Sequence, residues 1–223
     1  MLCLRDVYVW EFPVRLTHWV NVICLITLSF TGYYIGNPYI HNVHPFFYGV
    51  LKDQWVMGWM RLIHFSVAYV FAMSVLLRIY WGFAGNRHAR WSAMIPTTKE
   101  RRRTLLHDIR FYLLMEPAPA VSIGHSPTAG LAYLLLFLGY LVSILTGFAL
   151  LSQSHGGAFW YAAGGWILPS FPVQWVRLVH HVMMWFLIVF PIVHLYVGWT
   201  TDLVEENCVM SSIFSGRKTC GDE

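Results

Sequence analysis

The sequence predicts an all-α integral membrane protein, a four-helix bundle with both termini in the cytoplasm. Only 12% of its 223 residues are charged, whereas 57% are apolar, and a typical soluble domain has about 25% charged residues. Charges are also missing from long intervals, which separate Arg15 from Lys52, Arg61 from Arg78, Glu116 from Arg177, and Arg177 from Asp202. Each interval contains or nearly spans the roughly 20 apolar residues that cross a bilayer, where a central charge costs at least about 2.5 kcal/mol. The net charge of +4 therefore does not indicate nucleic-acid binding.

The four predicted spans follow these intervals in order along the chain. They cover residues 16–36, 59–83, 128–151 and 176–200. Between the second and third spans, the segment from Thr104 to Met115 mixes basic and bulky apolar residues. Such a segment is typical either of a helix lying on the inner membrane surface or of a packed connector. The sequence shows no internal repeat, so we expect residues 1–223 to form a single membrane domain.

The distribution of Lys and Arg predicts the orientation. The connection between the second and third spans holds Arg87, Arg90, Lys99, Arg101, Arg102, Arg103 and Arg110. The connections on the other side hold Lys52, Arg61 and Arg177. By the positive-inside rule, the middle connection and both termini are cytoplasmic. The first apolar run has full spanning length and no small-residue cleavage pattern after it, so we expect no cleavable signal peptide.

Histidines within the spans form two pairs at matched depths. His18 lies near the cytoplasmic start of the first span, and His64 lies near the outer start of the second. The fourth span also enters from outside, which places His180 at the depth of His64 and His194 at the depth of His18. We therefore expect the pairs His64 with His180 and His18 with His194.

The fourth span offers two adjacent histidines for the outer pair. His180 and His194 are 14 residues apart, which corresponds to about 21 Å along a helix and a return to within about 40° of the same face. In a regular helix, His181 would point about 140° away from His194. This phase favours His180, although a bend at Pro191 would alter it.

Paired imidazoles in an apolar bundle indicate a haem iron with two axial ligands, because the macrocycle is apolar and fills space between helices. Zinc usually takes four ligands clustered at one level, which two separated pairs do not provide. The sequence lacks Cys-x-x-Cys-His, so the haem is expected to bind noncovalently. All Asp and Glu residues lie outside the spans, which disfavours a proton pump or a cation transporter. A non-redox membrane anchor or transporter whose histidines bind metal or simply pack remains an alternative.

Other polar residues are secondary candidates. Arginines precede three of the paired histidines by three residues, at Arg15, Arg61 and Arg177. This spacing lets each one pair with a haem propionate, and it also suits anchors at the membrane interface. His41 and His44 form His-x-x-His in the outer connection, but two ligands are fewer than a zinc site needs. The scattered cysteines, Cys3, Cys24, Cys208 and Cys220, predict neither a disulfide framework nor an iron–sulfur site.

These motifs resemble the b-type cytochrome subunit of membrane-bound nickel-iron uptake hydrogenases over nearly the whole chain. The shared segments are Arg15-Leu-Thr-His-Trp19, Thr31-Gly32, Arg61-Leu-Ile-His-Phe65, Gly85-Asn-Arg-His-Ala-Arg90, Gly124-His-Ser-Pro127, Thr146-Gly-Phe-Ala149, and Arg177-Leu-Val-His-His-Val-Met-Met-Trp185 followed by His194. The family's four haem-iron ligands match His18, His64, His180 and His194, and His181 matches a position that is not a ligand.

The resemblance implies a multi-pass protein of the bacterial inner membrane with two haem b groups. It implies that the chain anchors the hydrogenase's small iron–sulfur and large nickel-iron subunits at the outer face. It also implies that electrons from the small subunit reach quinone, with no hydrogen chemistry on this chain. For quinone we consider His194 together with His125 and Ser126, although the last two equally suit a cap of the third span. A cytochrome subunit of another membrane oxidoreductase, such as formate dehydrogenase, is the alternative within this class.

Overall fold

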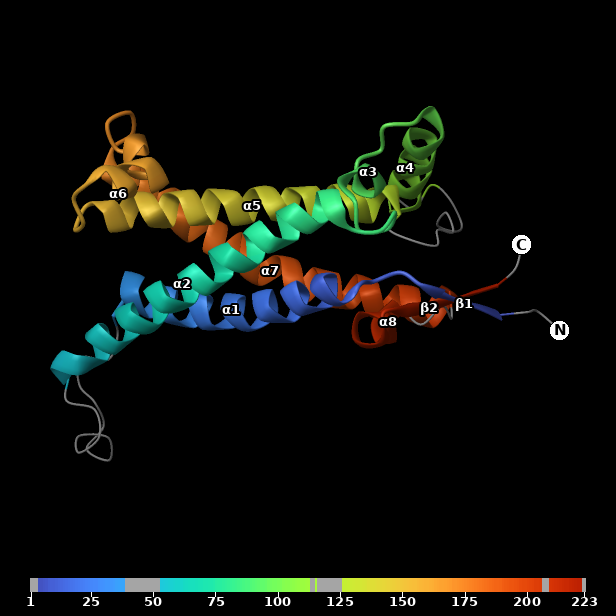
Figure 1. Ribbon diagram of the computed structural model, residues 1–223, viewed down its shortest axis with the longest axis horizontal. Helices are drawn as coiled ribbons and strands as arrows, with labels where there is room; N and C mark the ends of the chain where they lie inside the picture. Colours follow the sequence, from blue (N-terminus) through green and yellow to red (C-terminus); the bar gives the residue numbers. More distant parts are fainter. Residues whose placement is uncertain (1–3, 39–52, 113–114, 116–125, 206–208, 222–223) are drawn as a thin grey trace. The chain divides into compact units, whose positions relative to one another are not determined.

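The computed structural model describes residues 4–38, 53–112, 115, 126–205 and 209–221 (Figure 1). Four long helices carry most of the chain, namely α1 (Phe12–Gly36), α2 (Asp53–Ala84), α5 (Pro127–Ser152) and α7 (Val173–Glu205). The shorter elements are β1 (Leu4–Tyr8), α3 (Trp91–Met94), α4 (Lys99–Tyr112), α6 (Ala158–Ala163), the 3-10 helix η2 (Gly165–Ile167), α8 (Val209–Ser215) and β2 (Arg217–Gly221).

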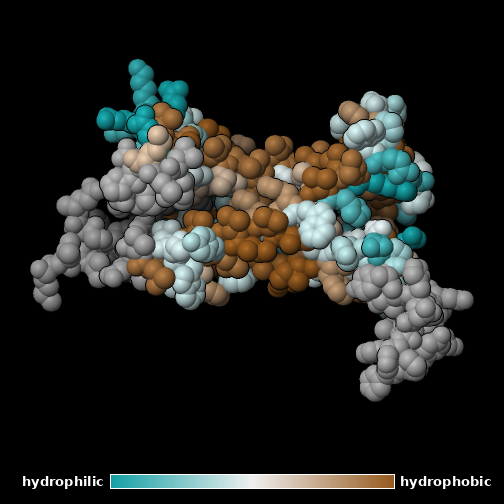
Figure 2. Space-filling view, turned by 180° about the vertical axis from the view of Figure 1, so that it is seen from behind, coloured by the Kyte–Doolittle hydropathy of each residue, from teal (hydrophilic) through white to brown (hydrophobic). Residues whose placement is uncertain are grey.

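Each long helix contains one of the predicted spans. The segments Phe12–Gly36, Val56–Ala84, Pro127–Ser152 and Val173–Leu203 are long and apolar enough to cross a membrane. Their outward side chains are apolar as well: Ile26 and Phe30 of α1 are 67% and 60% exposed. Figure 2 shows apolar residues gathered over the long helices on the face in view. Because a soluble protein rarely exposes so large an apolar surface, the prediction of an all-α integral membrane bundle is confirmed.

The helices extend beyond the predicted spans. Helix α2 begins at Asp53 rather than at residue 59, and α7 continues to Glu205 rather than ending at residue 200. Hydropathy marks the part of a helix that crosses lipid, whereas backbone hydrogen bonds continue into the polar flanks. Pro191 lies inside α7, which continues on both sides of it.

Residue contacts group the chain into two compact units. One contains residues 1–18, 76–138 and 191–223, and we call it the terminal unit because it includes both chain ends. The other contains residues 19–75 and 139–190, and we call it the internal unit. A single domain over the whole chain stays a prediction.

Within the internal unit, aromatic and small residues let the helices pack closely. Phe71 of α2 meets Tyr140 of α5 edge to face, with ring centroids 5.0 Å apart, and both side chains are buried. A Cβ atom on Gly139 of α5 would lie 2.8 Å from the ring of Phe186 of α7. The glycine therefore permits a close approach of α5 and α7.

Within the terminal unit, the two ends of the chain pair as strands. β1 and β2 form a two-stranded antiparallel sheet in which Leu4 lies opposite Gly221 and Tyr8 opposite Arg217 (Figure 1). The charge and hydropathy patterns gave no indication of this sheet. Pairing requires the two ends to lie on the same side of the membrane, as four crossings demand. Which side that is stays a prediction from the charge distribution.

In the terminal unit, the Glu11 carboxylate links the segment before α1 to the end of α2 by hydrogen bonds. Glu11 Oε2 accepts hydrogen bonds from Trp81 Nε1 and from the backbone N–H of Asn86, both at 2.8 Å. The Asn86 side chain donates to the carbonyl of Val9 at 3.0 Å. These bonds hold the turn after α2 against the segment that precedes α1.

A buried arginine organises the same turn. Arg78 of α2 is only 2% exposed and donates to the carbonyl of Ala89 at 3.2 Å. Its guanidinium lies 5.8–5.9 Å from the ring centroids of Trp91, Tyr133 and Phe137. Aromatic faces attract a cation, so the charge stays inside the protein instead of extending to water.

Residues 104–112 of the segment considered either an interfacial helix or a packed connector belong to α4, which begins earlier, at Lys99. Its Asp108 is 3% exposed and accepts a hydrogen bond from Thr128 at the start of α5, at 2.9 Å. This bond ties α4 to α5 within the terminal unit, as expected of a packed connector. A position on the membrane surface stays a prediction.

Candidate functional site

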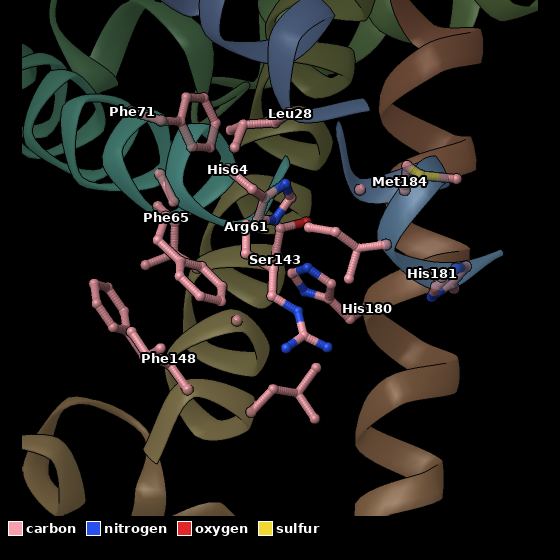
Figure 3. A pocket seen from close by; sticks show the side chains of 18 of the residues that line it. Leu28, Arg61, His64, Phe65, Phe71, Ser143, Phe148, His180, His181 and Met184 are labelled. Atoms are coloured by element: carbon pink, nitrogen blue, oxygen red, sulfur yellow. The ribbon is translucent and has the colours of Figure 1, made fainter. Parts of the chain in front are cut away.

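The internal unit brings two of the predicted histidines together. His64 comes from α2 and His180 from α7, and their ring centroids are 6.5 Å apart with an angle of 71° between the ring planes. Both side chains are partly buried and line one cavity, together with Arg61 and Ser143 (Figure 3). The structure thus brings His64 and His180 together, as the depth argument predicted, while their position near the outer face stays a prediction.

The separation of these rings matches the span of one coordinated metal ion. Two imidazoles on opposite sides of a metal have centres about 6 Å apart, since each metal–nitrogen bond is about 2 Å and each ring centre lies about 1 Å behind its nitrogen. The observed 6.5 Å therefore fits one ion between His64 and His180. Direct hydrogen bonding between the rings would need a shorter separation.

The cavity is large and mainly apolar. Its volume is about 700 Å³, within the range of roughly 300–1,000 Å³ that ligand pockets occupy. Apolar side chains of α1, α2, α5 and α7 form most of its wall, among them Leu25, Phe65, Phe148 and Leu187. A haem macrocycle matches this lining, because it is large, flat and apolar.

Two glycines border the histidines of this cavity. A Cβ atom on Gly32 of α1 would lie 3.1 Å from His64 Cε1, and one on Gly147 of α5 would lie 3.2 Å from His180 Cε1. Side chains at these positions would crowd both rings. Glycine therefore provides space for the imidazoles next to the cavity.

Positive charge is also present at the cavity. Arg61 of α2 and Arg177 of α7 line it, and both side chains are exposed. Each lies three residues before its histidine, so it shares that histidine's side of the helix. A bound group with carboxylates, such as haem, would find two cations there.

His181 occupies a different position from His180. Its imidazole is exposed and lies against Gly36 at the end of α1, where a Cβ atom would clash with the ring. His180, by contrast, lies beside His64. The two adjacent histidines therefore point in different directions, as predicted, although both line the cavity.

The terminal unit brings together the other predicted pair. His18 of α1 is partly buried and interacts electrostatically with His194 of α7, whose side chain is exposed. Nearby in sequence, Arg15 donates from Nη1 to the carbonyl of Phe214. Its Nε is buried and makes no hydrogen bond within the described residues. One donor of Arg15 therefore holds the C-terminal turn.

The predicted quinone residues are only partly described. His125 lies outside the described residues, as do His41 and His44. Ser126 precedes α5, and its Oγ accepts a hydrogen bond from the backbone N–H of Ala129 at 3.1 Å. Ser126 therefore caps α5, the alternative considered for it.

Two threonines at the site were not recognised as functional from the sequence. Thr31 Oγ1 lies 2.9 Å from His64 Nδ1, and Thr146 Oγ1 lies 2.9 Å from His180 Nδ1. Both belong to Thr-Gly pairs, with Gly32 in α1 and Gly147 in α5. This repeated dipeptide, in two apolar helices, is the signal that could have identified them.

Other titratable residues in the described part of the chain do not form a further centre. Within residues that the structure describes, no group of three or more His, Cys, Asp and Glu could hold a metal ion. His88 lies outside the spans, in the turn after α2. Its pKa is lowered by burial and, in smaller part, by the positive charges of Arg87 and Lys218.

Comparison with known proteins identifies the family. The family described as "Prokaryotic cytochrome b561" matches residues 9–216. A protein of Bradyrhizobium diazoefficiens is 39% identical, over 97% of this chain and 87% of its own length. One of Azotobacter chroococcum is 37% identical, over 97% and 90%, and one of Escherichia coli K12 is 34% identical, over 95% and 90%. The first two are named "Probable Ni/Fe-hydrogenase B-type cytochrome subunit", and the third "Probable Ni/Fe-hydrogenase 1 B-type cytochrome subunit".

These matches confirm the resemblance to hydrogenase cytochrome subunits that the histidine motifs indicated. They cover both histidine pairs, because the matched residues extend from 9 to 216. The chain belongs to the prokaryotic cytochrome b561 family.

Proposed function

We propose that this chain is a di-haem b-type cytochrome that anchors a nickel-iron hydrogenase to the bacterial inner membrane and transfers its electrons to quinone. The observation that carries this proposal is the separation of 6.5 Å between the His64 and His180 rings across an apolar cavity. Names of the relatives, which are hydrogenase cytochrome subunits, support the choice of partner.

His64 and His180 would hold the iron of the first haem. The apolar wall of the cavity would surround the macrocycle, and Arg61 and Arg177 would pair with its propionates. Haem, when bound, supplies a reversible one-electron carrier. The protein contributes two neutral imidazoles from different helices and an apolar wall, which together set the reduction potential.

His18 and His194 are the ligands of the second haem. Both belong to the terminal unit and interact electrostatically, and Arg15, one helical turn before His18, is the candidate cation for a propionate. In the bilayer the pair lies on the cytoplasmic side, as the charge distribution predicts. Two carriers at different depths let electrons cross the apolar interior.

Electrons enter from the iron–sulfur small subunit, which the chain holds at the outer face together with the nickel-iron large subunit. They leave to a quinone near His194, with His125 and Ser126 as its hydrogen-bonding partners. The cap at Ser126 is compatible with this role, because its hydroxyl accepts from Ala129 and keeps its own proton to donate. The chain itself performs no hydrogen chemistry.

The test is a haem count and a redox spectrum of the purified complex. We expect two noncovalent haem b groups per chain in a pyridine haemochrome assay, and b-type bands in the reduced-minus-oxidised spectrum. Hydrogen gas should reduce both haems in the complete complex, and added quinone should reoxidise them. Absence of b-type bands would refute a cytochrome, and one haem per chain would refute the second site.

A further inference from the structure

We propose that Thr31 and Thr146 are positioning residues that hold His64 and His180 as Nδ1-protonated imidazoles, leaving the Nε2 lone pairs for iron. This inference rests on the proposed haem site between the two rings. Each threonine lies 2.9 Å from Nδ1 of its histidine. Both come from a helix other than the one that carries the ring: α1 supplies the partner for α2, and α5 the partner for α7.

The position of the ring proton follows from counting hydrogens. Thr31 Oγ1 lies 2.7 Å from the carbonyl oxygen of Thr27, and Thr146 Oγ1 lies 2.6 Å from that of Val142. A carbonyl cannot donate, so at these distances each hydroxyl must give its only proton to its own helix. Toward the histidine, the hydroxyl has only lone pairs left. Nδ1 must then carry the proton that joins it to the threonine.

A second carbonyl beside each hydroxyl supports the same proton position. Thr31 Oγ1 also lies 3.3 Å from the carbonyl oxygen of Leu28, and Thr146 Oγ1 lies 3.2 Å from that of Ser143. Each carbonyl comes three residues before its threonine, so both acceptors of the hydroxyl proton belong to the threonine's own helix. With Nδ1–H directed at the threonine oxygen, the neutral imidazole has its free lone pair on Nε2.

The glycine after each threonine restricts the ring further. Gly32 and Gly147 face Cε1 of His64 and His180, where a Cβ atom would come within 3.1–3.2 Å. The ring thus lies against bare backbone and is held by a hydrogen bond at its Nδ1 corner. Together the Thr-Gly pairs fix both the tautomer of each ring and its plane, and the two planes are 71° apart.

This arrangement has a measurable electronic consequence. A hydrogen bond from Nδ1–H to an oxygen raises the basicity of Nε2, which stabilises ferric over ferrous iron and lowers the reduction potential. The threonine hydroxyls should therefore hold the potential of this haem below the value it would have without them. The second haem, which they do not contact, should be unaffected.

The experiment is a redox titration of the purified complex with Thr31→Val and Thr146→Val. Valine keeps the shape of threonine but has no hydroxyl. Each variant should therefore shift the midpoint potential of the haem between His64 and His180 to a more positive value. The haem at His18 and His194 serves as an internal reference. The EPR signal of the oxidised haem, which reports the angle between the ligand planes, should change in the same variants. Binding of this haem should weaken about tenfold, at the lower end of the effect of losing such a partner.

The conservative and control variants separate hydrogen bonding from packing. Thr31→Ser and Thr146→Ser keep the hydroxyl and should restore the wild-type potential. Thr200→Val in α7 is the matched control, because the Thr200 hydroxyl also donates to a carbonyl of its own helix, that of Tyr196 at 3.0 Å, and Thr200 takes no part in the contacts of Thr31 or Thr146. It should leave both potentials unchanged.

Two results would overturn the inference and leave the proposed function intact. One is an unshifted potential in both valine variants with the haem bound. The other is loss of the haem that serine fails to restore, which would show that packing alone matters. A wild-type complex without haem would instead refute the proposed function.

Discussion

The two compact units use polar side chains in opposite ways. In the internal unit, Thr31 and Thr146 lie beside His64 and His180, and the two histidines line a cavity of about 700 Å³. In the terminal unit, polar side chains join segments that are far apart in the sequence. An example is Glu11, which binds Trp81 and Asn86.

This difference shows that buried polar side chains in an apolar chain can either orient other side chains or join distant segments. A buried polar group must find a partner, because leaving it unpaired costs free energy. In the internal unit the partners orient rings beside a space for a ligand. In the terminal unit they close the structure at its ends, where Trp10 also donates to Ser212 at 3.0 Å. Substitutions at Thr31 or Thr146 should therefore change ligand binding at His64 and His180, whereas substitutions at Glu11 or Trp10 should change stability.

The largest expected effect is the loss of a ligand in the internal unit. His180→Ala should eliminate one of two haems, because no second imidazole then faces His64 across the cavity. His181→Ala should retain both, since His181 lies against Gly36. A pyridine haemochrome assay gives the count for each variant. Loss of one haem from the His181 variant, with both retained in the His180 variant, would show that His181 is the ligand.

Filling the space beside a ring should have the next largest effect. Gly147→Ala places a Cβ atom 3.2 Å from His180 Cε1, and such overpacking costs about 1–3 kcal/mol. We expect haem affinity to fall about tenfold or more in a haem-transfer assay, since about 1.4 kcal/mol corresponds to a factor of ten. The control is Gly58→Ala in α2, where a Cβ atom meets nothing within 4 Å. Equal affinities in the two variants would argue against a close fit at His180.

Removing the carboxylate of the terminal unit should reduce stability without altering the haem between His64 and His180. Glu11→Ala leaves two donors without their acceptor, at a cost of roughly 2–3 kcal/mol. Thermal unfolding in detergent should shift to lower temperature, while the potential of that haem stays unchanged. Glu100→Ala, an exposed residue in the first turn of α4, is the control and should change stability far less. A shifted potential of the haem between His64 and His180 in the Glu11 variant would show that Glu11 also acts on that site.

The smallest expected effect is a pH dependence in the terminal unit. Burial and the charges of Arg87 and Lys218 lower the pKa of His88 below its ordinary value of 6.5. The unfolded chain therefore binds this proton at higher pH than the folded chain, so stability is complete above pH 6.5 and declines as pH falls below it. Unfolding of the wild type and of His88→Gln, compared from about pH 8 to about pH 5.5, isolates the effect. A parallel decline in both would assign it to other groups.

Much of the fold could be predicted because membrane insertion is governed by local composition. The charge-free intervals identified all four long helices, and the error was confined to their ends, as at Asp53 and Glu205. Positions of the histidines along the spans also indicated the pairing of His64 with His180, because helix rise and span direction convert sequence number into depth. Their role as haem ligands is our proposal.

What the sequence by itself determined is thus the four long apolar helices and the pairing of His64 with His180. The depths of the histidines and the haem they would bind stay predictions. Only the tertiary structure decided which side chains orient those histidines and how the chain ends are joined. The Thr31–His64 and Thr146–His180 contacts, the strand pairing of β1 with β2 and the bonds of Glu11 join residues that are distant in sequence. The physical reason is that hydropathy and helical phase act within one segment, whereas a hydrogen bond between segments depends on which faces pack together.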